Sequence, residues 1–224
     1  MNTYESEQEQ LEALQKWWKE NGRAVIFGVL LGAIAIIGWS SWQAYTIQQA
    51  EKASRHYGQL LDSAKGNLYE KVTQKGNTLV EGFSNSGYTA LASLVIAKAA
   101  FQQNDIDKAK TYLQLAMDQE TSGAVQQLAR LRMARLLMDE GRWEDAITLL
   151  DENAGEFSSL YEEIRGDIFL AQGEPAKARS AYDQSLASAV LLGGQSQVRI
   201  RTKLDDLMGD DSKRKNTRNM PETE

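Results

Sequence analysis

The sequence predicts an all-α protein, with a single N-terminal transmembrane helix followed by an α-solenoid of helical hairpins. An uncharged run of 27 residues, Ala24 to Ala50, stands near the start of an otherwise polar chain. Proline occurs only twice, at Pro175 and Pro221, while Ala, Leu, Gln, Glu and Lys dominate, which favours helices over strands. A pattern that repeats with a period in the thirties then indicates stacked hairpins.

Residues 1–23 are expected to form a small amphipathic segment of their own. Ser6 and Glu9 have capping-box spacing, and Gly22 fits a helix C-cap. An apolar face that includes Trp18 would let this helix lie on the membrane surface, with its acidic residues toward water. The alternative is a short solvated tail without a partner.

Residues 24–45 are predicted to be the transmembrane helix, so the lipid bilayer is the first expected partner. The stretch 24–42 is almost wholly apolar, and at 1.5 Å per residue about twenty such residues span roughly 30 Å of hydrocarbon. A cleavable signal peptide fits less well, because its apolar core is shorter and follows a short basic start. Aromatic residues stand at both ends of the span: Trp17, Trp18, Trp39, Trp42 and Tyr45.

The flanking charges give an expected orientation. Lys16, Lys19 and Arg23 precede the span, whereas Lys52 and Arg55 follow it. Long domains after a span are translocated largely regardless of charge, so this slight excess places the N-terminus in the cytoplasm.

Two glycines inside the span predict a contact with another membrane helix. Gly28 and Gly32 form a GxxxG pattern, which removes side chains from one face and allows a second helix to approach closely. The alternative is that these glycines reflect only the general frequency of small residues in membrane helices.

Residues 46–208 are predicted to form one domain of tandem helical hairpins. Alignment on a small residue followed twelve positions later by alanine gives three copies of a repeat, spaced by 37 and then 32 residues. The turn and flanking positions agree in the same register. The matching sets are Ala97, Ala134 and Gly166; Ala109, Ala146 and Ala178; Asn104, Gly141 and Gly173; Ile106, Trp143 and Pro175; and Leu113, Leu150 and Tyr182.

This pattern has a physical reason. Two antiparallel helices pack closely only where their crossing carries small side chains, and the turn favours Gly or Asn, which adopt positive φ readily. The spacing is close to that of tetratricopeptide repeats, but the large aromatic residue expected early in each first helix is missing. The sequence therefore predicts degenerate tetratricopeptide-like hairpins. The alternative is a chance coincidence of alanine pairs in an alanine-rich chain.

The regions around the three repeats are less regular. Residues 45–65 are expected to continue the helix out of the membrane, and the glycines of residues 66–87 to break the pattern within a degenerate hairpin. Residues 195–208 are predicted to form a closing helix that covers the last repeat. Residues 209–224 are expected to be a disordered tail of mixed charge.

The composition excludes several classes of chemistry. The chain has no cysteine, which removes thiol nucleophiles and Cys-ligated metals, and its lone His56 cannot form a multi-histidine metal site. Neither a phosphate-binding loop nor a G-x-S-x-G nucleophile motif occurs. The basic residues of the tail are balanced by acidic ones, which argues against nucleic-acid binding. We therefore expect no enzyme activity, no catalytic or metal-binding residues, no cofactor and no small-molecule substrate.

The expected functional surface is the concave groove lined by the first helix of each hairpin. An apolar groove with basic residues along it would suit an extended or helical peptide. The alternative is that many of these side chains pack as core. The predicted groove residues are Leu91, Leu94, Lys98 and Phe101 in the first repeat, Leu128, Leu131, Arg135 and Met138 in the second, and Leu160, Asp167 and Leu170 in the third.

Three stretches resemble the YfgM family. They are MNTYESEQEQLEALQKWWKENGRAVIFGVLLGAIAIIGW at the start, YTALASLVIAKA at residues 88–99, and RGDIFLAQGEPAKARSAY at residues 165–182. The resemblance runs from Met1 to about Met208 in the same order. It implies a short cytoplasmic N-terminus, one inner-membrane helix and a periplasmic tetratricopeptide-like domain, with the SecYEG translocon and the PpiD-type periplasmic chaperone as partners. No catalytic residues come with the family.

The sequence thus leads to one main functional hypothesis and one alternative. The main hypothesis is a non-enzymatic inner-membrane scaffold that docks PpiD, associates with SecYEG and assists newly translocated proteins. The alternative is a membrane-anchored adaptor in envelope-stress signalling that acts through the acidic residues 1–23. A third class, an envelope hydrolase, has no candidate residues.

Overall fold

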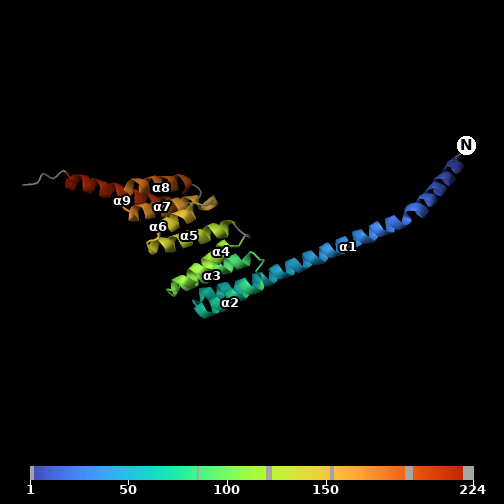
Figure 1. The fold of residues 1–224 in the computed structure, drawn as a ribbon, viewed down its shortest axis with the longest axis horizontal. Coiled ribbons are helices and arrows are strands. Elements are labelled where there is room, and N and C mark those ends of the chain that lie inside the picture. The colour runs from blue at the N-terminus through green and yellow to red at the C-terminus, as the bar shows by residue number, and fades with distance from the viewer. Residues whose placement is uncertain (1–2, 85, 120–122, 152–153, 190–193, 219–224) are drawn as a thin grey trace, which may run out of the picture. The chain divides into compact units, whose positions relative to one another are not determined.

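The structure is a computed structural model that describes residues 3–84, 86–119, 123–151, 154–189 and 194–218. Within these ranges every regular element is a helix, so the predicted all-α fold is confirmed. The helices are α1 (Thr3–Lys65), α2 (Tyr69–Gly82), α3 (Tyr88–Gln102), α4 (Ile106–Met117), α5 (Gly123–Asp139), α6 (Trp143–Leu150), η1 (Gly155–Phe157), α7 (Ser158–Ala171), α8 (Pro175–Ser188) and α9 (Gly194–Arg218) (Figure 1).

The chain divides into two compact units, Met1–Lys52 and Ala53–Glu224. In the first unit, helix α1 carries the uncharged run, and the large apolar side chains of residues 26–47 are exposed. Among the described residues, the stretch Leu14–Lys65 is helical, long and apolar enough to cross a membrane. A bilayer is the environment that suits such an unburied apolar surface.

The expected helix end at Gly22 is wrong. Helix α1 passes through Asn21 and Gly22 without a break, and the Trp18 ring lies beside Gly22. The reason is that the following residues are apolar and must pair their backbone groups within the segment, so the helical hydrogen-bond pattern continues through the glycine. Residues 3–23 are therefore the start of a longer helix.

In the second unit the predicted hairpins are α3–α4, α5–α6 and α7–α8. Each pair is joined by a tight turn at the predicted residue, and Asn104, Gly141 and Gly173 have φ of 61°, 75° and 76°. At each turn the next backbone N–H donates to a carbonyl five residues earlier, as from Asp105 to Ala100 at 3.0 Å. This left-handed C-cap ends the first helix and reverses the chain.

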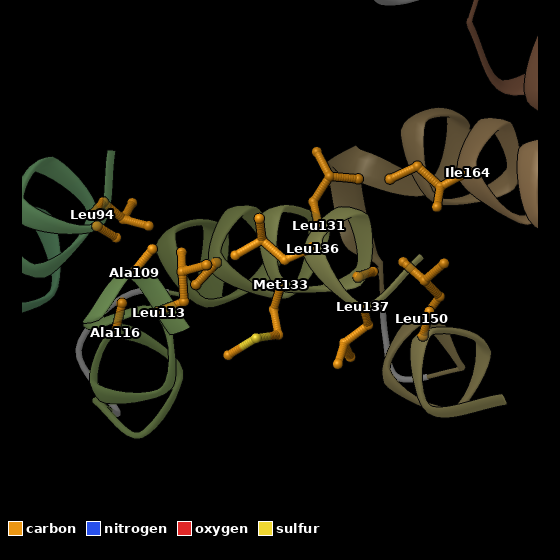
Figure 2. Packing of buried hydrophobic residues seen from close by; sticks show 14 of the residues in the cluster. Leu94, Ala109, Leu113, Ala116, Leu131, Met133, Leu136, Leu137, Leu150 and Ile164 are labelled. Carbon is orange, nitrogen blue, oxygen red and sulfur yellow. The ribbon is translucent and has the colours of Figure 1, made fainter. Parts of the chain in front are cut away.

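The core of the second unit is centred on helix α5. Its Leu131 points to one side and its Met133 and Leu137 to the other, with residues of α3 and α4 at one end of the cluster and of α6 and α7 at the other (Figure 2). Because α5 is apolar on several faces, it packs against both neighbouring hairpins at once. This arrangement is the stacking that a helical-repeat array requires.

A fourth hairpin precedes the three predicted ones. Its first helix is the end of α1, its turn is at Asn67 with φ of 53°, and its second helix is α2. Gly76, expected to break the pattern, lies in the middle of α2, where an added Cβ would overlap the side chain of Ile96. The glycine is therefore a close-packing position rather than a helix breaker.

The closing helix is confirmed, but it is longer than expected. Ile200 and Leu207 of α9 are buried against Tyr182 and Ala189 of the last repeat. The helix continues to Arg218, past the expected end at Met208, and the disorder expected for residues 209–224 stays a prediction. Acidic residues there precede basic ones by four positions, a spacing that favours helix. The rest of the predicted tail, residues 219–224, lies outside the described residues.

Candidate functional site

The second unit contains an open cavity, a groove of about 670 Å³. Its walls come from the end of α1, from α3 and from α5, the first helices of three consecutive hairpins, and Tyr69 and Val72 of α2 also line it. We call this cavity the groove. Its lining residues are Tyr57, Leu61, Ala64, Lys65, Asn67, Tyr69, Val72, Leu91, Leu94, Val95, Lys98, Ala99, Gln102, Gln103, Leu128 and Arg132.

Four of the predicted residues line the groove: Leu91, Leu94, Lys98 and Leu128. Leu91 and Leu128 are half-buried and Lys98 is exposed, so their side chains are accessible. Leu94 is only 5% exposed and also belongs to the packed core, with its side chain reaching toward α4 and α5 (Figure 2). The accessible apolar surface of the groove therefore rests on Leu91 and Leu128 rather than on Leu94.

A second cavity of about 340 Å³ lies beside the groove, between α3, α4 and α5. It contains two further predicted residues, Phe101 and Arg135, together with Asp139. Phe101 is 50% exposed, which is unusual for a phenylalanine outside the membrane helix. Lys98 and Arg132 line both cavities, so together they form the ridge between them.

The remaining predicted residues lie elsewhere. Leu131 is 2% exposed and packs near Ile164 in the core, and Met138 packs against the same cluster (Figure 2). Neither lines the groove or the second cavity. In the third repeat, Leu160 also packs against the core, and Leu170 is exposed at the end of α7. For Leu131, Met138 and Leu160 the structure thus agrees with the alternative that the side chain serves the core.

The charged side chains that line the groove are all positive. Its lining contains Lys65, Lys98 and Arg132 but no carboxylate, although the chain carries a formal net charge of −6. Arg132 was not predicted from the sequence. It is half-buried and donates from Nη1 to the carbonyl of Leu94 at 3.3 Å. Burial, and then the neighbouring Arg135 charge, lower the pKa of the Arg132 guanidinium.

Comparison with known proteins identifies the family. A family model described as a tetratricopeptide repeat-like domain matches residues 15–209. An ancillary SecYEG translocon subunit of Aggregatibacter actinomycetemcomitans is 30% identical, with 92% of this chain and 98% of the relative covered. The chain belongs to the YfgM family of ancillary SecYEG translocon subunits. Proteins with the same description from Escherichia coli K12 and Haemophilus influenzae are 29% and 28% identical, covering 85% and 90% of this chain and 92% and 97% of the relatives.

In this member of the YfgM family the third repeat carries charges of the opposite sign. Glu163 of α7 is 4% exposed and accepts hydrogen bonds from Arg199 Nε at 2.8 Å and Nη2 at 2.7 Å. Lys203 of α9 bonds Glu163 at 2.9 Å and Asp167 at 2.6 Å. Burial alone would raise the pKa of the Glu163 carboxyl, but the bonds from Arg199 and Lys203 hold that pKa below its ordinary value.

This acidic cluster fastens the closing helix. Asp167 was predicted as a groove residue, but Glu163 and the pairing of both carboxylates with α9 were missed by sequence reasoning. The signal was present in the repeat register, because Glu163 occupies the position of Leu94 and Leu131, and Asp167 that of Lys98 and Arg135. Tyr182 adds a hydrogen bond from its hydroxyl to Asp167 at 2.6 Å. With both carboxylates paired to α9, this part of the third repeat is occupied by the chain itself.

The two glycines of the membrane helix have free space around them. An ideal Cβ at Gly28 or Gly32 would meet no atom within 4 Å in the described part of the chain. Their contact with another membrane helix therefore stays a prediction.

Proposed function

We propose that this chain is a non-enzymatic, single-pass inner-membrane scaffold with its N-terminus in the cytoplasm and its helical repeats in the periplasm. The repeats associate with the SecYEG translocon and dock a PpiD-type periplasmic chaperone, and thereby assist newly translocated proteins. The observation that carries the proposal is the groove, an open surface on the first helices of a repeat array. The names of the relatives support the translocon as the site of action.

The arrangement of the groove suits protein binding. Its half-buried apolar residues, such as Leu91, Val95 and Leu128, provide area for an apolar anchor, and its polar rim provides hydrogen-bond donors. The span in α1 anchors the domain to a membrane, which keeps it near a membrane-embedded partner. The docking surface on the chain is proposed to be the groove together with Phe101 and Arg135 of the second cavity.

Site-specific photocrosslinking in native membranes tests the proposal. A photoreactive residue at Leu91 or Arg135 is expected to capture the chaperone or a channel subunit, and one at Gly28 a membrane helix of the translocon. Leu131, buried in the core, is the matched negative position. If Leu91, Arg135 and Gly28 give no adduct with either partner, while the protein remains in the membrane, the proposal is wrong.

The signalling alternative predicts a different result. If residues 1–23 recruit a cytoplasmic regulator, deletion of residues 2–15 changes an envelope-stress reporter and leaves translocon crosslinks unchanged. The scaffold proposal predicts no such reporter change while the crosslinks from the repeats persist.

A further inference from the structure

The ridge between the groove and the second cavity carries cations that form no ion pair with the described residues. Lys98 and Arg132 lie on it, and Arg135 lines the second cavity beside it. Neither Lys98 nor Arg135 makes a hydrogen bond or ion pair with any residue that the structure describes. Asp139, the one carboxylate in the lining of the second cavity, also forms no salt bridge with these cations.

Arg132 has unused hydrogen-bonding capacity. A guanidinium offers five N–H donors, and the hydrogen bond that Arg132 makes within the described part of the chain uses Nη1, toward the Leu94 carbonyl. Arg132 is half-buried and is repelled by Arg135, so the two cations destabilise each other. A carboxylate placed between them would remove this repulsion and accept bidentate hydrogen bonds.

In the third repeat, the position that corresponds to Lys98 and Arg135 is paired with another segment of the same chain. Asp167 occupies the position of Lys98 and Arg135, and its carboxylate is paired with Lys203 at 2.6 and 2.7 Å. The partner segment there is helix α9, which also buries Ile200 beside the ion pairs. An incoming segment therefore binds this position by charge pairing combined with apolar burial. In the first two repeats the residue at this position is positively charged, and no segment of the described chain packs over it in the way that α9 does.

We infer that the groove, together with the second cavity beside it, binds an acidic peptide segment of a partner protein. Carboxylates of that segment pair with Lys98, Arg132 and Arg135, and a large apolar side chain packs on Leu91 and Leu128. The inference rests on the proposed function and deepens it, because it gives the chemistry of the docked segment. Charge complementarity selects this occupant, since the groove is cationic in a chain with a formal net charge of −6.

The binding test uses the full-length protein in nanodiscs of zwitterionic lipid. The probe is a short fluorescent peptide in which Glu or Asp alternates with Leu or Phe, and the matched probe carries Gln or Asn in place of each acid. The acidic probe is expected to bind at least about tenfold more tightly, and its affinity is expected to fall as salt is added. Equal affinity of the two probes would overturn the inference.

Charge reversal locates the binding. The variant Lys98→Glu with Arg135→Glu is expected to lose affinity for the acidic probe by about tenfold or more, and to gain affinity for a probe with Lys in place of each acid. The gain in affinity for the basic probe would show that the variant is folded. The matched control is Arg179→Glu with Arg201→Glu, two exposed cations outside the groove, which changes the net charge equally and should leave affinity nearly unchanged.

Two other outcomes also contradict the inference. Binding to vesicles that contain phosphatidylglycerol, with no binding of the acidic probe, would make the cations a lipid site. Loss of affinity in the Arg179 and Arg201 control equal to that in the groove variant would make the effect one of net charge. Translocon crosslinks of the wild-type chain that persist when the acidic probe fails would reject the inference and leave the proposed function standing.

Discussion

At the scale of single residues, the helix crossings pair the smallest side chains with large ones. Gly166 of α7 lies against the ring of Tyr182, and an added Cβ would overlap that ring. The ring is fully buried and its hydroxyl donates to Asp167 at 2.6 Å, so it has little freedom to move. Burial and the Asp167 carboxylate raise the pKa of the Tyr182 phenol, which keeps it a donor.

The substitution Gly166→Ala is therefore expected to lower the free energy of unfolding by about 1–3 kcal/mol, because the Tyr182 ring must shift in a packed core. The measurement is denaturant unfolding of the full-length protein in micelles, followed by circular dichroism. The matched control is Gly58→Ala, at an exposed helical position with no atom within 4 Å of the new Cβ. That change should stabilise the helix by up to about 1 kcal/mol. Equal effects of the two substitutions would contradict the packing account.

Glu163 gives the second prediction at this scale. Its folded pKa lies below the ordinary value of 4.5, so its stabilisation is present above the unfolded pKa and is lost as pH falls through the folded pKa. Glu163→Gln should lower the free energy of unfolding by about 1–3 kcal/mol near neutral pH, since Arg199 and Lys203 lose their anionic partner. The difference from wild type should shrink steadily below about pH 4.

The pH series is measured as unfolding midpoints of wild type and variant at each pH. Glu81→Gln serves as the control, because Glu81 is an exposed carboxylate on α2. Its profile should parallel that of wild type. A constant offset between wild type and Glu163→Gln down to the most acidic pH would show that the ion pairs do not carry the effect.

At the scale of helices, the turns of the three repeats were predictable, whereas the first hairpin was expected only as a degenerate one outside the repeat register. Asn104, Gly141 and Gly173 combine a residue that tolerates positive φ with a fixed distance to the next helix, and both signals are local. In the three predicted repeats a small residue stands seven positions before the turn. In the first hairpin this position holds Leu60, and the small residue, Gly76, lies on the second helix. Gly76 makes its tightest contact with Ile96 of α3, in the next hairpin, a contact visible only once the helices are packed together.

The candidate site was predicted in part, for a similar reason. Helical periodicity places Leu91, Lys98 and Leu128 on the first helices, and they line the groove. It cannot distinguish the groove face from the face toward the next hairpin when both are apolar, so Leu131 was expected in the groove and lies in the core. Arg132 was missed because its side chain becomes part of the groove only through its contact with α3.

Helix α9 gives the prediction at the scale of elements. Ile200 is fully buried against the last repeat, and Val198 on the same helix is exposed. Ile200→Ala should lower the free energy of unfolding by about 2–4 kcal/mol and expose the last hairpin to proteolysis. Val198→Ala should change it by less than about 1 kcal/mol. Similar protease sensitivity of both variants would show that α9 does not act as the closing helix.

At the scale of the whole molecule, one helix serves both units of the chain. Helix α1 contains the apolar run of the first unit, and its last turns, with Tyr57 and Leu61, form a wall of the groove in the second. A cut or a helix-breaking substitution between these parts would separate the anchor from the binding domain without touching the groove residues. The biological value of that connection depends on the side of the membrane on which the repeats lie.

The orientation can be measured directly because the chain has no cysteine. Gln15→Cys and Gln74→Cys place one thiol on an exposed residue before the span and one after it. In intact spheroplasts an impermeant maleimide should label the second variant only, since the basic residues before the span favour a cytoplasmic N-terminus. After permeabilisation both variants should label equally. Labelling of Gln15→Cys in intact spheroplasts would reverse the topology and place the groove in the cytoplasm, where a periplasmic chaperone cannot reach it.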